Sequence, residues 1–161
     1  MSIAMSALDS RIAVYEDQYI INNCCFSTLA NNGGIYNVRV GGTKITLPAA
    51  KRLIWKLNNY LAHCGGGAGS DLISVYMYVK NETTAATVAQ TTTLTVGRGA
   101  SSSIDSQEIN FEGSAGSTYQ LYMYVSVASD DHCVAFFNGG ILWVLPTTQT
   151  TAPTTGYLLN T

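Results

Sequence analysis

The sequence predicts a mainly β protein, an antiparallel β-sandwich with one amphipathic helix at about residues 48–62. Hydrophobic residues make up 47% of the 161 residues and charged residues only 11%, against a usual charged share of about 25%. Apolar runs recur every ~8–12 residues between turn signals, the spacing typical of a sandwich or barrel. A chain of this length fits one domain and can bury a core without additional cross-links.

Two segments, 75–79 and 121–125, have nearly the same sequence, VYMYV and LYMYV. Side chains alternate between the faces of a strand, so the aliphatic residues and methionines share one face and the tyrosines the other. A solvated face would carry polar residues, whereas tyrosine combines apolar area with a hydroxyl and is enriched at interfaces. We therefore predict a sheet packed on both faces, with a candidate assembly surface formed by Tyr76, Tyr78, Tyr122 and Tyr124.

The chain divides into an N-terminal arm (1–18), a single sandwich domain (19–146) and a Thr/Pro-rich tail (147–161). Turn signals rich in Asn, Gly, Ser and Asp separate β-branched and aromatic runs. The predicted strands are 19–22, 24–29, 35–40, 72–80, 87–96, 104–111, 119–128, 133–137 and 141–145. The tail ends in an apolar tip, Tyr157, Leu158 and Leu159, which we add to the candidate assembly surface.

One segment, 48–62, has the features of a helix. Thr46 can serve as N-cap, Pro48 stands near the first helical position, and Gly65 begins a glycine run that would end the helix. An apolar stripe recurs at i, i+4, i+7 and i+8, namely Leu53, Leu57, Tyr60 and Leu61. We expect this helix to pack over the sheet rather than to lie on a membrane.

Charge is unevenly distributed along the chain. All eight Lys and Arg lie at or before Arg98, so the first 98 residues carry +3 (eight minus five acids) and the remainder −5. If folding preserves this asymmetry, it favours complementary patches on neighbouring subunits. Only Lys51, Arg52 and Lys56 cluster, without interleaved aromatics, so nucleic acid is not an expected partner. No apolar run approaches the roughly 20 residues of a membrane span, and no secretory signal is recognised.

The cysteines and histidines offer the residues most relevant to chemistry: Cys24, Cys25, Cys64, Cys133, His63 and His132. No C-x₂₋₄-C pair exists, and neighbouring strand residues point apart, so a zinc site is not expected. A nucleophilic Cys133 with His63, or Cys64 with His132, would need a base and an orienting acid brought together. The favoured interpretation is free cysteines acting as small buried hydrophobes, with a disulfide from Cys64 left open. We predict no enzyme activity and no cofactor.

Two further motifs have simple interpretations. Asn81-Glu82-Thr83 matches a glycosylation sequon, but without an export signal we interpret it as a turn. Trp143 and Tyr124 are candidates for a sugar-binding platform, although core packing is favoured for both. A carbohydrate- or receptor-binding module therefore remains the alternative function, with Trp143 as its sugar contact and a host-surface glycan as its partner.

The segment from Gly113 to Pro146 resembles a known arrangement. A Gly-rich turn precedes STYQLYMYV, and Asn138-Gly139-Gly140 precedes ILWVLP. This order is similar to the closing strands of jelly-roll domains in viral virion proteins and of tumour-necrosis-factor/complement-C1q-like domains, and 72–82 is similar to an earlier core strand of that pattern. The resemblance covers about half the chain, and it departs at Ser117, where an acidic turn residue is usual, and in the helix and the tail.

What the resemblance implies is a jelly-roll-like virion structural protein of a bacteriophage or similar virus, such as a minor capsid, head-decoration or fibre-head component. Its partners would be capsid or other virion subunits, in a homo-oligomer for which a trimer is favoured. Its location would be the virion, after synthesis in the host cytoplasm. Arms and tails that order on neighbouring subunits fit such a role.

Overall fold

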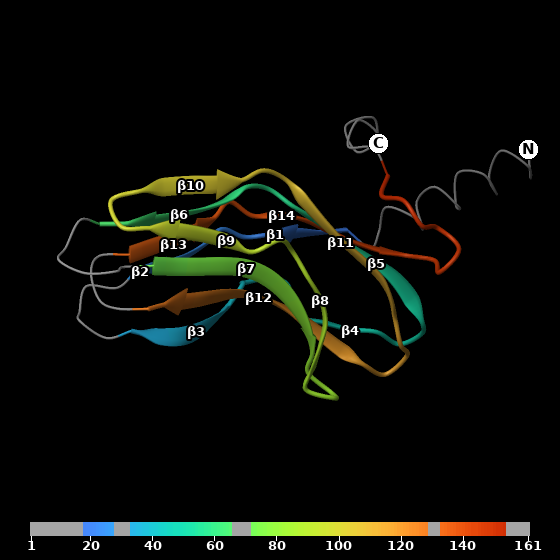
Figure 1. The fold of residues 1–161 in the computed structure, drawn as a ribbon. Helices are drawn as coiled ribbons and strands as arrows, with labels where there is room; N and C mark the ends of the chain where they lie inside the picture. The colour runs from blue at the N-terminus through green and yellow to red at the C-terminus, as the bar shows by residue number, and fades with distance from the viewer. Residues whose placement is uncertain (1–17, 28–32, 66–71, 129–132, 154–161) are drawn as a thin grey trace, which may run out of the picture.

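The computed structural model describes residues 18–27, 33–65, 72–128 and 133–153, and these contain strands, turns and connections but no helix. The strands pack as two layers with the core between them (Figure 1). Their bounds are β1 Gln18–Ile21, β2 Cys24–Ser27, β3 Gly34–Arg39, β4 Ile45–Thr46, β5 Lys51–Leu57, β6 Tyr60–Cys64, β7 Leu72–Asn81, β8 Ala86–Gln90, β9 Leu94–Gly97, β10 Ser101–Ile104, β11 Gln107–Gly113, β12 Thr118–Val127, β13 Cys133–Phe137 and β14 Gly140–Leu145.

These strands form three antiparallel sheets. Two have four strands, in the orders β1-β14-β5-β11 and β10-β6-β13-β2. The third follows the path β3-β12-β7-β8, with β4 also paired to β12 and β9 to β7. Its longest pairing joins β7 and β12, where Met77 lies opposite Met123. The two segments of nearly identical sequence are therefore neighbours at the centre of one sheet.

The two four-stranded sheets are halves of one continuous layer. On one side of the boundary Leu57 pairs with Gly140, and three residues further along each strand Tyr60 pairs with Phe137, so the register is unchanged. Hydrogen bonds continue between the two rows, from Asn58 N to the Gly139 carbonyl at 2.8 Å and from Asn138 N to the Asn59 carbonyl at 3.1 Å. The boundary is therefore a crease across a single layer.

The crease consists of two residues from each of four chain segments. The outer two pairings keep their register across it as well, between β1/β2 and β14/β13 and between β11/β10 and β5/β6. Two of the four segments have an Asn doublet here and a third has Asn followed by Gly. The crease residues are Asn22, Asn23, Asn58, Asn59, Asp105, Ser106, Asn138 and Gly139.

Crossing the crease changes which residues face the core. Leu57 is 1% exposed and Tyr60 is fully buried, although an odd spacing of three residues would place them on opposite faces of a regular strand. Asn58 and Asn59 between them take the polar positions, and alternation then resumes with a buried Ala62. Each strand thus keeps its apolar residues on the core side while the sheet bends.

This spacing explains why the predicted helix at 48–62 is wrong. The structure places Lys51–Leu57 and Tyr60–Cys64 in strands. Two apolar runs of period two, separated by Asn58-Asn59, give gaps of three and four residues that resemble a helical stripe. The buried positions distinguish the two patterns. Trp55, Ala62 and Cys64 face the core. They belong to a strand pattern that is interrupted at Asn58-Asn59, but not to the predicted helical stripe.

Two further pairs of strands share a partner: β3 and β4 both pair with β12, and β8 and β9 both pair with β7. Joining these pairs, and the strands that meet at the crease, gives eight long segments in two layers of four. In chain order, the first layer runs first–eighth–third–sixth and the second runs second–seventh–fourth–fifth. This is the strand order of a jelly roll, a double-sheet fold built from two Greek keys. The predicted antiparallel β-sandwich is thus observed, but within the described residues it is built from strands alone, without the predicted helix.

The core fills the space between the layers. Fully buried side chains from β7 and β12 meet those of β5, β6, β13 and β14 in one cluster. One polar link also crosses it: the Tyr60 hydroxyl donates to the Thr92 carbonyl and lies 3.1 Å from Thr91 Oγ1, which accepts from Met77 N at 3.0 Å. Because these groups are satisfied inside the core, they fix how the two layers are placed against each other.

Candidate functional site

The strongest candidate site is the outer face of the six-stranded sheet. On β7, Val75, Met77 and Val79 are fully buried in the core, and the alternation of the strand turns Tyr76 and Tyr78 to the other side. β12 repeats this arrangement with Tyr122 and Tyr124. The predicted separation of aliphatic and tyrosine faces is therefore confirmed.

The four tyrosines form a stacked group, which we call the tyrosine face: Tyr76, Tyr78, Tyr122 and Tyr124. The ladder places Tyr78 opposite Tyr122 and Tyr76 opposite Tyr124. Ring centroids are 5.3 Å apart in the first pair and 4.4 Å in the second, with interplanar angles of 15° and 14°. Cross-strand aromatic pairs of this kind each stabilise a sheet by about 0.5–1.5 kcal/mol beyond their buried area.

Stacking determines what the tyrosine face offers to a partner. Each ring covers a face of its cross-strand partner, so edges and hydroxyls are presented more than open ring faces. Tyr78 and Tyr122 are only 8% and 6% exposed, whereas Tyr76 and Tyr124 are half-buried. A sugar platform needs an open ring face, so this geometry suits contact with another protein surface better than sugar stacking.

Polar groups hold one end of the tyrosine face. The Arg39 Nε donates to the Tyr122 hydroxyl at 3.3 Å, and that hydroxyl donates to Glu82 Oε1 at 2.5 Å. The Tyr78 hydroxyl donates to Asn37 Oδ1 at 2.8 Å. The positive charge of Arg39 and the negative charge of Glu82 balance each other, so the border of the face carries little net charge. The sequence offered no signal for these partners, which lie about 40 to 80 residues away along the chain.

The hydroxyls of Tyr76, Tyr78 and Tyr122 stay protonated well above neutral pH. Burial raises the pKa of Tyr78 to about 12, with Tyr122, Tyr76 and Glu82 acting in the same direction. Burial likewise raises the pKa of Tyr76 and of Tyr122. The face is consequently a neutral surface of apolar rings and hydrogen-bonding hydroxyls under physiological conditions.

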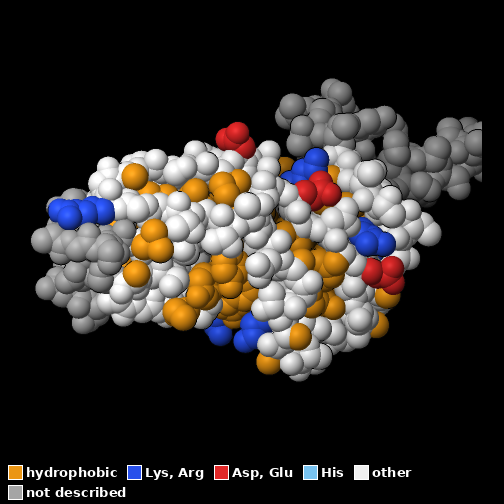
Figure 2. Space-filling view, in the orientation of Figure 1, with side chains coloured by type: hydrophobic (Ala, Val, Ile, Leu, Met, Phe, Trp, Pro, Cys, Tyr) orange, Lys and Arg blue, Asp and Glu red, His pale blue; other side chains and the backbone are white. Residues whose placement is uncertain are grey.

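Exposed apolar residues extend this surface. Figure 2 shows hydrophobic side chains gathered over β7 and β12, with few charged groups among them. Ile35 on β3 is 63% exposed, and Leu72 and Val88 lie on β7 and β8. By strand alternation Ile35 and Leu72 project to the same side as the tyrosines, and Val88 lies at a bulge where β8 pairs with β7. An apolar surface of this kind on a sheet is typical of an interaction site.

The other predicted assembly residues, Tyr157, Leu158 and Leu159, lie outside the described residues, as does the arm except for Gln18. The described part of the tail lies against its own domain. Asn110 Nδ2 donates to the Thr150 carbonyl at 2.9 Å, and Ala152 packs on a small outer cluster.

That outer cluster contains the predicted sugar contact, Trp143. The residue is 1% exposed and packs with Ile54 and Leu145 on the side of the first layer away from the main core. A sugar could reach the Trp143 ring only if this cluster opened. The sugar contact at Trp143 therefore stays a prediction, and the described surface gives it no open ring.

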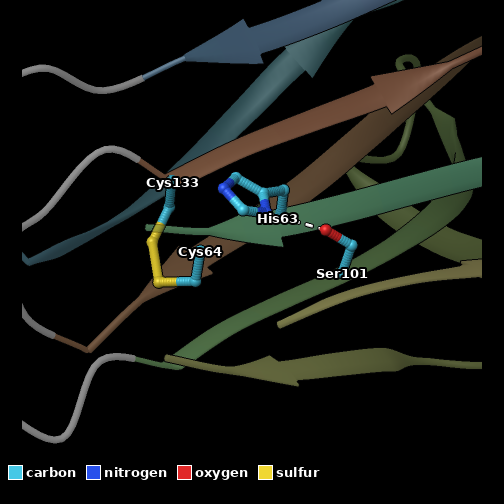
Figure 3. The surroundings of a disulfide bond; sticks show 4 residues. All are labelled: His63, Cys64, Ser101 and Cys133. Atoms are coloured by element: carbon cyan, nitrogen blue, oxygen red, sulfur yellow. Dashed lines mark hydrogen bonds between the residues drawn. A yellow bond between two sulfur atoms is a disulfide. The ribbon is translucent and has the colours of Figure 1, made fainter. Parts of the chain in front are cut away.

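The structure joins Cys64 and Cys133 in a disulfide, which corrects the expectation of free buried cysteines at these positions. They lie opposite each other on β6 and β13, with Cα atoms 4.2 Å apart, and both are fully buried. Figure 3 shows the bond at the ends of the two strands, with His63 turned to Ser101, whose Oγ lies 2.7 Å from His63 Nδ1. Sequence spacing could not identify this pair, because only the register brings together residues 69 apart.

The remaining cysteines are free. Cys24 is half-buried and Cys25 exposed, and burial, with a smaller contribution from Cys25, raises the pKa of the Cys24 thiol. A raised pKa reduces the thiolate fraction, so Cys24 is not an activated nucleophile. Within the described ranges no three His, Cys, Asp or Glu residues gather as metal ligands. His132 lies outside those ranges.

The charge asymmetry along the sequence is partly cancelled by folding. Arg52 pairs with Glu112 at 3.6 Å and Lys56 with Glu108 at 3.9 Å, both between β5 and β11. Basic residues of the first part thus meet acidic residues of the second within one molecule. Among the residues that the structure covers, no helix is long and apolar enough to cross a membrane.

No protein-family model and no curated protein matches the chain. Solved structures with some similarity include infectious bursal disease virus Gx strain, at 8% identity and a TM-score of 0.35 over 80% of this chain and 33% of that chain. The VP2 subviral particle of the same virus gives 10% and 0.31 over 80% and 34%. The CBM22-1-GH10 modules of Clostridium thermocellum xylanase 10B, complexed with xylohexaose, give 13% and 0.22 over 86% and 28%. The chain spans about a third of the length of the viral chains, and at these TM-scores the likeness carries no argument about function.

Proposed function

We propose that this protein is a non-enzymatic structural component of a virion, of the minor capsid, decoration or fibre-head kind, that joins neighbouring subunits through its tyrosine face. The observation that carries the proposal is the stacked group Tyr76, Tyr78, Tyr122 and Tyr124, on the side of its sheet that lies away from the other described layer. Tyrosine is among the residues most enriched in interface cores and hot spots.

Several features support a protein subunit as the partner. The rings stack on each other, so they arrive at an interface already ordered, and little conformational entropy is lost when a flat surface docks on them. The border charges, Arg39 and Glu82, are paired through Tyr122, which lowers the cost of desolvating them. We favour a homo-oligomer, with a trimer as its expected form.

The disulfide supports a location outside a reducing cytosol. Structural disulfides persist in secreted proteins and on virion or cell surfaces, and they are rare in cytosolic ones. Jelly rolls occur in viral capsid and lectin domains alike. That analogy concerns the fold alone. The choice between a capsid role and a lectin role therefore depends on the properties of the interaction face.

The assembly role is tested with the full chain by size-exclusion chromatography and light scattering over a concentration series. We expect a trimer, and a shift to monomer for the double variant Tyr76→Ser, Tyr124→Ser, because both half-exposed rings are removed. The matched control is Tyr19→Ser, a 42% exposed tyrosine on β1 in the other layer, which should leave the oligomer unchanged.

The virion role has its own measurement. The protein should co-sediment with density-purified particles at a constant ratio to the major capsid protein. The double variant should be depleted from these particles. A wild-type chain that is monomeric at every concentration and absent from purified particles would contradict the proposal.

A further inference from the structure

A second site lies on the first layer, beside the crease and away from the tyrosine face. A half-open cavity of about 370 Å³ is lined by residues of β5, β11 and β14 and of the crease between them: Lys56, Leu57, Asn58, Ser106, Gln107, Glu108, Gly140 and Ile141. Its volume falls within the range of small-molecule sites, roughly 300–1,000 Å³. We call it the crease pocket.

Two polar groups of the crease pocket, Glu108 and Asn58, have hydrogen-bond partners within the protein. Glu108 lies between two donors, Lys56 Nζ at 3.9 Å and Asn110 Nδ2 at 3.2 Å, and the Asn110 amide is anchored in turn on the Thr150 carbonyl. Asn58 Nδ2 donates to the Asn138 carbonyl at 3.1 Å, which fixes the side chain and leaves its Oδ1 as an acceptor. Preorganised polar groups cost little entropy when a ligand binds.

The pocket also has an apolar side. Ile141 lies opposite Lys56 in the ladder, and on the next strand Ile20 lies opposite Ile141 and is 75% exposed. One row across the sheet thus runs from an exposed isoleucine through Ile141 to the ion pair of Lys56 and Glu108. A ligand on this row meets hydrocarbon at one end and a dense set of donors and acceptors at the other.

This arrangement selects a chemical class. The single cation and single carboxylate neutralise each other, so the pocket favours a neutral ligand over an anion or a cation. Lys56 supplies donors, and Glu108 and Asn58 supply acceptors. The Gln107 amide accepts from Thr92 Oγ1 and donates to the Ser106 carbonyl, each at 3.4 Å, and keeps one N–H and one lone pair for a ligand. A sugar ring fits these demands, because each hydroxyl both donates and accepts while the C–H face of the ring is apolar.

We propose that the crease pocket binds a neutral carbohydrate, with the ring against Ile141 and its hydroxyls on Asn58, Gln107, Glu108 and Lys56. The site is separate from Trp143, and it does not depend on the proposed assembly role. We expect a dissociation constant on the order of 1 mM for one monosaccharide unit, since so small a ligand buries few atoms.

The test starts with the full chain on a glycan array, displayed multivalently, and continues with NMR titration of the strongest neutral glycan. The expected shifts map to the backbone amides of Lys56, Asn58, Gln107, Glu108 and Ile141. The double variant Gln107→Ala, Glu108→Gln should weaken binding at least roughly tenfold.

The matched control is Glu112→Gln, which breaks the ion pair with Arg52 between the same two strands but outside the pocket; it should bind within about twofold of wild type. Thermal melting confirms that both variants fold, and the shift map of the wild type does not depend on them. An array without a neutral glycan hit, shifts that map elsewhere, or binding unchanged in the double variant would each overturn the proposal.

Discussion

At the scale of single residues, the tyrosine face combines burial with hydroxyl chemistry. Tyr78 is 8% exposed although it lies on the outer side of its sheet, because the stacked ring of Tyr122, the tilted ring of Tyr76 and Asn37 surround it. The neutral hydroxyl of Tyr78 is stable there because it is hydrogen-bonded. A phenolate at this position would lose its hydration, and no cation among the described residues would compensate for that loss. The residue therefore links the electrostatics of the surface to the stability of the sheet.

Alkaline pH should destabilise the protein through this residue. The folded pKa of Tyr78 is about 12 against an ordinary value of 10.0, so the unfolded chain releases the proton first. The stabilisation is complete below pH 10 and is lost as pH rises through about 12. Denaturant unfolding at a series of alkaline pH values should show the free energy of unfolding falling over this interval.

The variant Tyr78→Phe provides the comparison, because it cannot ionise at this position. It should unfold with a smaller dependence on pH in the same interval. A dependence as steep as that of the wild type would contradict the assignment to Tyr78.

Gly140 is a residue whose size decides whether two strands can pair. A Cβ at this position would overlap the Lys56 carbonyl oxygen and lie 3.0 Å from the Leu57 Cα on the neighbouring strand. We expect Gly140→Ala to lower the free energy of unfolding by about 2 kcal/mol or more, as measured by urea titration. Gly97→Ala is the control, because no atom lies within 4 Å of its added Cβ; a similar loss there would contradict the steric explanation.

At the scale of elements, the crease and the disulfide join distant segments into one layer. The crease lets four segments bend together without a change in register, since each devotes two residues to it. The disulfide ties β6 to β13 near the end of that layer. Both features depend on pairings between segments far apart in sequence. The contacts that define this layer are therefore strongly non-local.

Reduction of the disulfide should cost about 4 kcal/mol in free energy of unfolding, because the bond closes a loop spanning 69 residues. The measurement is urea unfolding with and without a reducing agent. The double variant Cys64→Ala, Cys133→Ala should match the reduced wild type and be insensitive to the agent. Equal stability of oxidised and reduced wild type would contradict a structural role for the bond.

At the scale of the whole molecule, the two layers present different surfaces. The six-stranded sheet offers the neutral tyrosine face, whereas the creased layer offers charged pairs, the crease pocket and a small apolar cluster on which the described part of the tail packs. A subunit built this way can bind a neighbour with one layer while the other remains free for a second ligand.

The tail should divide into two parts with different roles. Removing 154–161 should leave the melting temperature within about 2 °C of the full chain, whereas removing 147–161 should lower it by about 3–8 °C, because the contacts of Thr150 and Ala152 are lost. Calorimetry checks both. If the tip serves assembly, the shorter truncation also weakens the oligomer seen by light scattering; equal melting temperatures for both truncations would contradict the packing role of 147–153.

The sequence by itself predicted a β-sandwich and the separation of its faces, although the helix that it also predicted at 48–62 was wrong. Alternation along 75–79 and 121–125 assigned the tyrosines to one side and the methionines to the other, since side-chain period is a local property of a strand. The turn formed by Asn81 was also predictable, because its Oδ1 accepts from the amides of Thr83 and Thr84 nearby in the chain.

Only the tertiary structure decided which segments meet. The interruption at Asn58-Asn59 looks helical in isolation, and it becomes a crease only because three other segments interrupt their alternation beside it. The stacking of the tyrosines, the pairing of Cys64 with Cys133 and the crease pocket likewise depend on register across the sheet. Register is set by the burial of the whole apolar pattern between two layers, and that is a property of the folded molecule rather than of any one segment.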